Sequence, residues 1–205
     1  MPPHSDPPGD GRAARAFRTN DLIVSAFLEM LERDGHLRPT ASQVAGRAGV
    51  SRRALYIHFE TIEGLIAVAL ERRSTEICAE WPELPLHRTL DDRVSWFCQH
   101  WSRLAEVLLP LRRAAAVHEP FSPQIAAVVG QTRQWVRDAI EWTFLPELAT
   151  RPAAEHAALA IALHHAASLG AWDELRFQGV AIDDARSTMG LLITGLLGDG
   201  NLTVA

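Results

Sequence analysis

Thr40-Ala-Ser-Gln-Val-Ala-Gly-Arg-Ala-Gly-Val-Ser-Arg-Arg-Ala-Leu-Tyr-Ile-His-Phe59 is the stretch of the chain that decides the fold. It predicts two short helices joined by a tight turn. Thr40, with Gln43 three residues later, forms a Thr-x-x-Gln capping box for the first helix. Gly49 ends that helix, because a left-handed C-terminal position costs glycine little. Ser51 can then cap the second helix.

The second helix has an inward and an outward face. Leu55 and Phe59 are four residues apart and turn inward together. The outward side chains are basic or aromatic: Arg52, Arg53, Tyr56 and His58. A short helix of this kind, braced by another across a glycine turn, has the geometry of a helix-turn-helix that reads DNA.

The predicted DNA contacts are Thr40, Ser42, Ser51, Arg52, Arg53, Tyr56 and His58. The two arginines can each offer a fork of donors to guanine or contact a phosphate. The hydroxyl and imidazole groups suit phosphate contacts, which set the register of the protein on the duplex. Thr40 and Ser42 lie at the start of the bracing helix, where free backbone N–H groups favour an anion. An arginine-bearing arm, residues 12–18, can reach the backbone or the minor groove.

The order Thr-x-x-x-Val-Ala-x-x-Ala-Gly-Val-Ser-x-x-x-Leu-Tyr-x-His-Phe, with Leu65 downstream, closely resembles the tetracycline-repressor family of bacterial regulators. The resemblance is strong over about residues 20–72. It implies an all-α homodimer with an N-terminal three-helix DNA-binding domain and a C-terminal domain that binds a small molecule and dimerises. Family members often carry lysine where this chain has Ile62, so the resemblance does not imply that lysine's phosphate contact here. Arg53 replaces a small residue and can add a contact.

The composition agrees with an all-α protein and excludes several other classes. No evenly spaced series of alternating, β-branched strands is present, and no stretch approaches the apolar length that spans a bilayer. The N-terminus has no hydrophobic run, so it is not a signal peptide. Cys78 and Cys98 are too few and too far apart for a metal knuckle or a redox pair. We therefore expect two reduced thiols in a cytoplasmic protein without a cofactor.

The net charge of −5 by itself argues against a nucleic-acid binder, but the distribution of charge matters more than its total. All 20 basic side chains other than histidine are arginines. Six of them cluster just before the first helix and around the turn: Arg12, Arg15, Arg18, Arg47, Arg52 and Arg53. The alternative is that these arginines only solvate helix surfaces.

The chain divides into four predicted segments. Residues 1–11 form a disordered arm, residues 12–61 the helix-turn-helix domain, residues 62–80 a linker helix, and residues 81–205 the ligand-binding and dimerisation domain. The first helix is predicted to begin at Asn20 or Asp21 and to end near Asp34, before Gly35.

In the last segment, apolar spacing predicts a helix from Thr89 that ends at Pro110, with a short further helix over 111–117. Another helix follows over about 123–145. The final two helices, residues 153–170 and 184–198, carry many small residues among leucines, and Gly170 ends the first of them. Two copies of this pair suit a four-helix dimer interface. The alternative is that they only close the monomer core.

Aromatic side chains concentrate in the C-terminal segment and suggest a cavity for a flat or lipophilic effector. The candidate effector-binding residues are Phe97, His100, Trp101, His118, Trp135 and Trp142. The competing interpretation is that the tryptophans simply fill a helical core.

Other classes of protein leave weaker signals. The chain lacks a Gly-x-Ser-x-Gly motif, a phosphate loop and a dinucleotide fingerprint, so an enzyme is not expected. His156, His164 and His165 suggest a metal-responsive regulator, but they lack the spacing of four residues that pairs two histidines on a helix. No metal site is therefore predicted. An effector-independent DNA-binding protein remains the other alternative.

Overall fold

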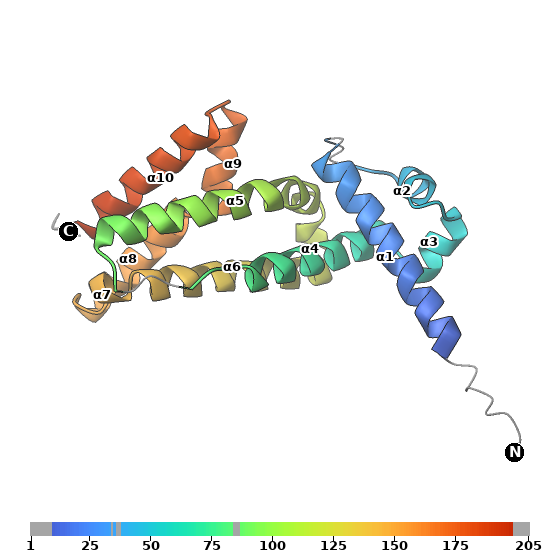
Figure 1. Ribbon diagram of the computed structural model, residues 1–205, viewed down its shortest axis with the longest axis horizontal. Coiled ribbons are helices and arrows are strands. Elements are labelled where there is room, and N and C mark those ends of the chain that lie inside the picture. Colours follow the sequence, from blue (N-terminus) through green and yellow to red (C-terminus); the bar gives the residue numbers. More distant parts are fainter. Residues whose placement is uncertain (1–9, 34, 36–37, 84–86, 199–205) are drawn as a thin grey trace, which may run out of the picture. The chain divides into compact units, whose positions relative to one another are not determined.

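The computed structural model describes residues 10–33, 35, 38–83 and 87–198 (Figure 1). The described residues are helical throughout, with turns and loops between the helices and without strands. The elements are α1 (Asp10–Glu32), α2 (Ala41–Arg47), α3 (Arg52–His58), α4 (Ile62–Ala79), α5 (Leu90–Ala116), the 3₁₀ helix η1 (Glu119–Phe121), α6 (Pro123–Thr143), α7 (Leu145–Leu148), α8 (Ala153–Ala166), α9 (Leu169–Phe177) and α10 (Ile182–Leu197). The predicted all-α class is confirmed.

Two compact units divide the chain. The first comprises the chain up to Arg73 together with Pro110–Val128, and the second comprises Ser74–Leu109 and the chain from Val129 onward. Helices α4, α5 and α6 each contribute one part to each unit. These two units are defined by contacts between residues, whereas the four segments predicted from the sequence are defined by their expected functions. The boundaries of the four segments therefore remain predictions.

In the first unit α1, α2 and α3 pack against one another. Thr40 and Gln43 form both bonds of the predicted capping box: the Gln43 amide donates to Thr40 Oγ1 at 3.3 Å, and the Thr40 amide donates to Gln43 Oε1 at 2.9 Å. Gly49 has φ +67°, and the Val50 amide donates back to the Ala45 carbonyl at 3.0 Å, which completes a Schellman ending of α2. The Thr40 cap and the glycine stop are confirmed.

The predicted start of α1 is wrong. The helix begins at Asp10, ten residues before Asn20, so residues 12–18 lie on a helix and not on an arm. The added turns carry exposed side chains such as Arg15 and Phe17, whereas the buried face begins at Ile23. The expected disorder of residues 1–11 falls mostly on residues 1–9, outside the described part of the chain.

The predicted break at Pro110 is also wrong, because α5 continues through it to Ala116. Proline removes one helical hydrogen bond and crowds the preceding turn. Leu109 and Leu111 on either side of it are buried, as is Ala115 one turn later. Burial of these side chains offsets the energetic cost of a proline inside a helix. The helix therefore continues through Pro110, although proline normally ends one.

The third correction concerns Gly170, which was expected to end a helix over 153–170. Instead α8 ends at Ala166, and Gly170 lies inside a separate helix, α9. Ser168 starts α9 by accepting a hydrogen bond from the Ala171 amide at 3.1 Å. The serine cap is the sequence signal that identifies this helix.

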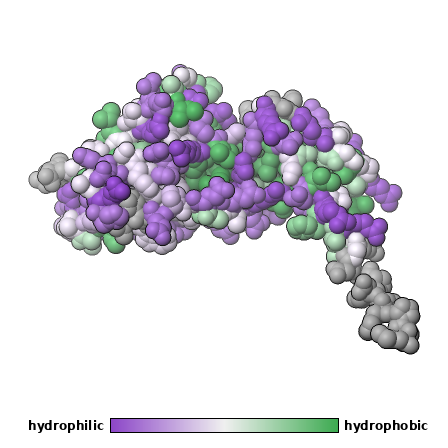
Figure 2. Space-filling view, in the orientation of Figure 1, coloured by the Kyte–Doolittle hydropathy of each residue, from purple (hydrophilic) through white to green (hydrophobic). Residues whose placement is uncertain are grey.

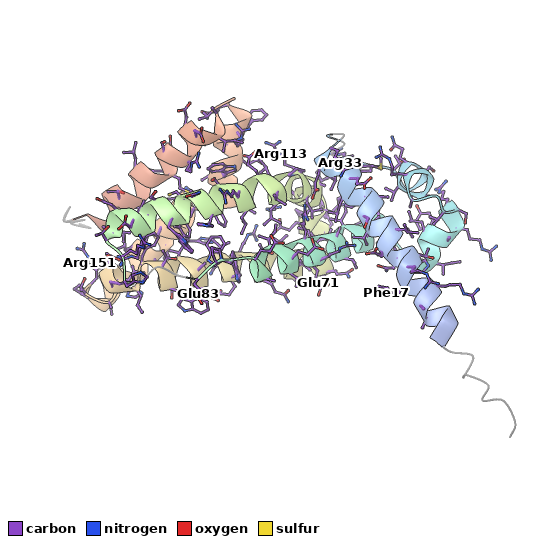
Figure 3. The ribbon with its side chains drawn as sticks, viewed as in Figure 1. Phe17, Arg33, Glu71, Glu83, Arg113 and Arg151 are labelled. Atoms are coloured by element: carbon purple, nitrogen blue, oxygen red, sulfur yellow. The ribbon has the colours of Figure 1, made fainter. Side chains whose placement is uncertain are left out.

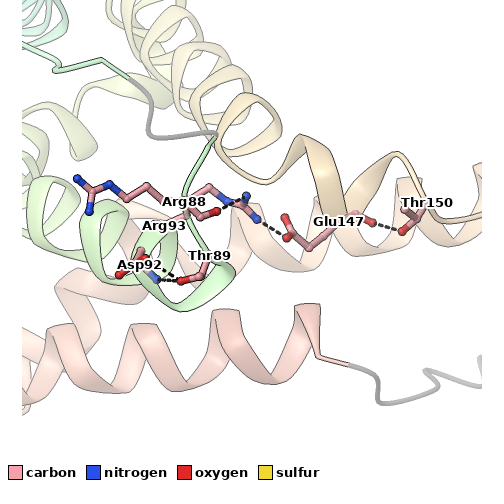
Figure 4. Close-up of polar contacts among 6 residues, drawn as sticks. All are labelled: Arg88, Thr89, Asp92, Arg93, Glu147 and Thr150. Carbon is pink, nitrogen blue, oxygen red and sulfur yellow. Dashed lines mark hydrogen bonds and ion pairs between the residues drawn. The ribbon is translucent and has the colours of Figure 1, made fainter.

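A buried ion pair links α5 to α7 in the second unit (Figure 4). Arg93 is almost fully buried, and its guanidinium donates to the Glu147 carboxylate and, at 3.2 Å, to the Arg88 carbonyl. Thr89 caps α5 beside it, because its Oγ1 accepts from the Asp92 amide at 3.2 Å. A charge held this deeply needs its partner, so Glu147 fixes where α7 meets α5.

Both cysteines are free thiols in the described residues, and they differ in their surroundings. Burial raises the pKa of the Cys98 thiol to about 12 and also raises the pKa of the half-buried Cys78 thiol. Because the thiolate is the reactive form, we expect Cys78 to react slowly with a disulfide reagent at pH 8 and Cys98 to react only after denaturation. Counting modified thiols by mass before and after unfolding tests this. Equal rates for the two cysteines in the native protein would contradict it.

Among the described helices, none combines the length and the apolar character needed to cross a membrane.

Candidate functional site

Helix α3 presents a compact polar and aromatic face. Leu55 is fully buried and Phe59, the residue after the helix, nearly so, which confirms their inward orientation. Ser51 caps the helix by accepting from the Ala54 amide at 3.0 Å. The exposed positions of the helix are Arg52, Arg53, Tyr56 and Ile57. The inward side chains thus hold α3 on the unit while its opposite face is left to solvent.

Arg52 and Tyr56 form a pair on this face. The Arg52 guanidinium carbon lies 5.7 Å from the centroid of the Tyr56 ring, within the range of a cation–π contact. The two residues are one helical turn apart, so the contact steadies a long side chain without covering its donors. Arg53 is exposed beside them, and His58 at the end of the helix is half-buried.

The two DNA contacts predicted at the start of α2, Thr40 and Ser42, differ in whether their hydroxyl groups already have a role within the protein. Thr40 is already engaged in the capping box, where its hydroxyl also donates to Gln43 Oε1 at 2.8 Å. Ser42 is exposed. Thr40 therefore serves first to start the bracing helix α2.

Other arginines near this face have structural partners. Arg47 lies 3.7 Å from Glu29 of α1, and Arg15 donates from Nε to the Gly11 carbonyl at 3.0 Å. Arg18 is exposed on α1, close to the exposed Phe17 that Figure 3 labels near the N-terminal end of that helix. On the visible side of the part of the chain that carries α1–α3, hydrophobic and hydrophilic surfaces alternate (Figure 2).

Ile57 lies on this face but is not among the residues that the sequence predicts to contact DNA. Its side chain is 72 % exposed, on the same helix as the two arginines. An apolar residue in a helix that follows buried residues is normally taken for core, which is why it was overlooked. Its spacing of four residues from Arg53 is the signal that places it on the outward face.

Four of the six candidate effector residues gather in one aromatic cluster of the second unit: Phe97, His100, Trp101 and Trp135. The residue that joins them is Trp81, which is not among the six candidates and whose ring lies 5.1 Å from that of Trp135 and 6.1 Å from that of Phe97. Trp81 lies in the proline-containing break after α4, outside any helix whose apolar spacing could have identified it as part of the cluster. Trp96 and Phe144 complete the cluster.

The other two candidates lie elsewhere. Trp142 is 58 % exposed on α6. His118 belongs to the first unit, where its Nδ1 is 3.1 Å from Glu63 of α4.

Two buried indole N–H groups of the aromatic cluster have no hydrogen-bond partner, those of Trp81 and Trp101. Trp172, a buried residue of the same unit, donates its indole N–H to Glu106 at 2.8 Å. A buried donor without an acceptor costs on the order of 1–3 kcal/mol. Such exceptions need an explanation, and an acceptor supplied by a ligand or a water is one.

An apolar groove of about 400 Å³ lies elsewhere in the second unit, among α8, α9 and α10. Its lining includes Trp172, Leu175, Met189 and Leu192, and it contains none of the six candidate effector residues. The aromatic cluster and this groove are therefore separate features.

The histidines do not assemble a metal site in the described part of the chain, where no group of three or more His, Cys, Asp or Glu side chains is placed to hold an ion. Burial lowers the pKa of His164, and the charges of Arg137 and Arg133 lower it further. Neighbouring positive charge also disfavours a bound cation. Nothing in these residues favours the metal-responsive alternative.

The helix-turn-helix region matches a family described as bacterial regulatory proteins, tetR family, over residues 23–69. Two proteins of Pseudomonas putida are each 30 % identical to the chain over 118 residues, or 57 % of its length. One of them, the uncharacterized HTH-type transcriptional regulator TtgW, is covered over 76 % of its length. The other, the HTH-type transcriptional regulator SrpR, is covered over only 48 %, so the chain spans about half of that relative.

The fold has solved counterparts. A putative TetR-family transcriptional regulator from Rhodococcus sp. aligns over 88 % of this chain and 100 % of its own, with a TM-score of 0.66 and 18 % sequence identity. That likeness establishes the fold alone. Because the similar proteins are described as regulators, the expectation that the chain is not an enzyme is confirmed.

Proposed function

The chain belongs to the tetR family of bacterial regulatory proteins, and we propose that it is a transcription repressor that binds a palindromic DNA operator as a homodimer and is released by a small aromatic or lipophilic effector. The observation that carries the DNA-binding part is the exposed face of α3. It combines two exposed arginines with a tyrosine, on a short helix capped at Ser51 and braced by α2. This is the arrangement in which a recognition helix enters a major groove.

Specific phosphate and base contacts divide among these residues. Arg52 and Arg53 offer bidentate donors to guanine or charge to a phosphate. Ser42, Ser51, Tyr56 and His58 fix the register through phosphates, and Thr40 contributes by starting the bracing helix α2. The arginines of α1 add sequence-independent attraction, because each neutralised phosphate releases counterions.

A homodimer is supported by apolar side chains that α8 and α10 leave to solvent. These two helices pack along each other. Ile161 of α8 is 71 % exposed and Leu191 of α10 is 75 % exposed, and the neighbouring Leu192 is also exposed. Small residues such as Ala157 and Gly195 beside them allow close helix approach. A second copy of the pair would bury these side chains in a four-helix interface.

Placing a charge in this surface is expected to abolish the dimer. Leu191→Asp should sediment as a monomer at micromolar concentration and lose operator binding, since one recognition helix reads too few bases. Its fold should persist, because the residue is exposed. Analytical ultracentrifugation with circular dichroism tests this, and Phe177→Asp is the matched control on exposed Phe177 of α9. A dimeric Leu191→Asp protein would contradict the assignment of this surface.

The effector part of the proposal rests on the aromatic cluster. The rings of the cluster pack edge to face, with interplanar angles of 89° for Trp81–Trp135 and 85° for Trp81–Trp96, an arrangement that a further aromatic ring can join. The two indole N–H groups without acceptors add polar donors to that environment. Release then follows if the effector favours a conformation that the operator does not bind.

A titration of the purified protein against duplexes from the region flanking its own gene, at two salt concentrations, tests the proposal. Saturable binding that exceeds binding to a scrambled duplex at both salts is the expected result. Equal binding to both duplexes would leave only the sequence-independent phosphate interaction and would refute a specific regulator acting at that region. The same titration then serves to screen effectors by loss of the complex.

A further inference from the structure

We propose that Ile57 reads the methyl group of a thymine in each half of the operator, and so helps to determine its sequence. This inference rests on the proposed DNA-binding function and adds a specificity residue to it. It begins from the exposed set of α3, of which Ile57 is the one aliphatic member beside Arg52, Arg53 and Tyr56.

Ile57 has no role in the packing of α3. The inward side of the helix is supplied by Leu55 and, just beyond the helix, Phe59, both buried. Ile57 is 72 % exposed, even more than Tyr56 at 40 %. Single exposed apolar residues are common on proteins, so exposure alone says little. What distinguishes this one is its place on the face that also carries the DNA-contacting candidates.

The dimensions of α3 bring Ile57 within reach of base edges. A helix of seven residues is about 10 Å long, shorter than the roughly 12 Å width of the major groove. The whole exposed face, not only its first turn, can therefore lie in the groove. Ile57 is one turn from Arg53, which separates their Cβ atoms by about 5–6 Å. With successive bases about 3.4 Å apart, the two residues meet bases within about two steps of each other.

The chemistry of the groove supplies one apolar partner. Among the four bases only thymine presents a methyl group in the major groove, and the polar groups of all four bases there are hydrogen-bond donors or acceptors. An isoleucine side chain has neither donor nor acceptor, so a polar edge opposite it would lose hydrogen bonds to water without replacement. Its β-branched side chain is also stiff, so little rotamer freedom is lost on contact.

A thymine-to-uracil exchange isolates this contact, because deoxyuridine differs from thymidine only by the missing methyl group. The operator is first selected from random duplexes with the unaltered protein. Each symmetry-related pair of thymines is then replaced by deoxyuridine. One pair, within about two base pairs of the position that depends on Arg53, is expected to weaken binding about fourfold per methyl, which corresponds to about 0.8 kcal/mol each. For the two half-sites together this amounts to about 15-fold.

The same exchange with an Ile57→Ala protein completes a double-mutant cycle. This variant should bind the thymine operator more weakly and show no further loss at that pair when uracil replaces thymine. Ile57→Val, which keeps a branched apolar surface, should retain most of the preference for thymine. Thermal unfolding of both variants should match the unaltered protein, because the residue is exposed.

Two failures are distinguishable. If the protein selects an operator but no thymine pair depends on the identity of residue 57, the methyl-reading role is wrong while the DNA-binding function stands. The same conclusion holds if uracil weakens the unaltered protein and Ile57→Ala equally. If no sequence is selected from the random duplexes at all, both the inference and the proposed function are overturned.

Discussion

Replacing Arg52 and Arg53 together by alanine is expected to reduce operator affinity by about a thousandfold or more. Each arginine that contacts DNA is worth at least about 1 kcal/mol, and a homodimer presents four of them, so about 4 kcal/mol is lost. Both side chains are exposed and α3 keeps its cap and its buried Leu55, so the loss arises in binding and not in folding. Fluorescence anisotropy on a labelled operator, with circular dichroism of the free variant, measures it.

Single substitutions separate base reading from phosphate contact. An arginine that reads guanine should, when replaced by alanine, relax the preference at one base pair and leave the salt dependence nearly unchanged. An arginine on phosphate should weaken all duplexes alike and reduce the salt slope by about 1. Arg52, held against the Tyr56 ring, and Arg53, without that ring contact, need not share one role.

The matched control removes two arginines from elsewhere. Arg88 and Arg103 are exposed near and on α5, and their double replacement by alanine changes the net charge of the protein by the same amount. It should leave operator affinity within about threefold, the change expected of long-range charge that salt screens. If both double variants weakened binding equally, net charge and not the α3 face would govern the interaction.

The sequence predicted the helix-turn-helix because every signal in it is local. The capping box at Thr40 and the glycine stop at Gly49 operate within a few residues, and the structure has both. The start of α1 was missed because its first three turns have no buried stripe for a periodicity argument to detect. Pro110 and Gly170 were misread because burial around α5, and the serine cap of α9, outweigh a single helix-breaking residue.

In the candidate site, too, the sequence predicts the features that depend on local residue spacing and not those that depend on tertiary contacts. The polar members of the α3 face follow from residue type and spacing, whereas Ile57 does not, since apolar residues are assigned to the core by default. The aromatic cluster depends on contacts between residues far apart in the chain, such as Trp81 with Trp135. Composition could locate the aromatics in one domain, but it could not show that Trp81 joins them while Trp142 stays exposed.

Glu147→Gln is expected to reduce the free energy of unfolding by about 3 kcal/mol, the lower end of the cost of removing one partner of a buried ion pair. Arg93 is buried at the junction of α5 and α7, and the amide can replace the hydrogen bond but not the charge (Figure 4). Urea denaturation followed by circular dichroism measures the loss. Glu155→Gln, on an exposed position of α8, is the control for removing one carboxylate and should change stability by less than about 0.5 kcal/mol.

The double variant Arg93→Met with Glu147→Leu tests whether the ion pair contributes mainly to stability or to the specific placement of α7 on α5. Because both charges are then removed together, most of the stability lost in Glu147→Gln should return. A double variant as unstable as the single one would mean that the space between α5 and α7 cannot be filled by apolar side chains, and that packing, not charge, limits this junction. Recovered stability with weakened operator binding would instead show that the ion pair specifies how α7 and the helices after it seat on α5. Since α8 and α10 carry the proposed dimer surface, such a change would act on DNA binding through the proposed dimer and not through any contact of Arg93 or Glu147 with DNA.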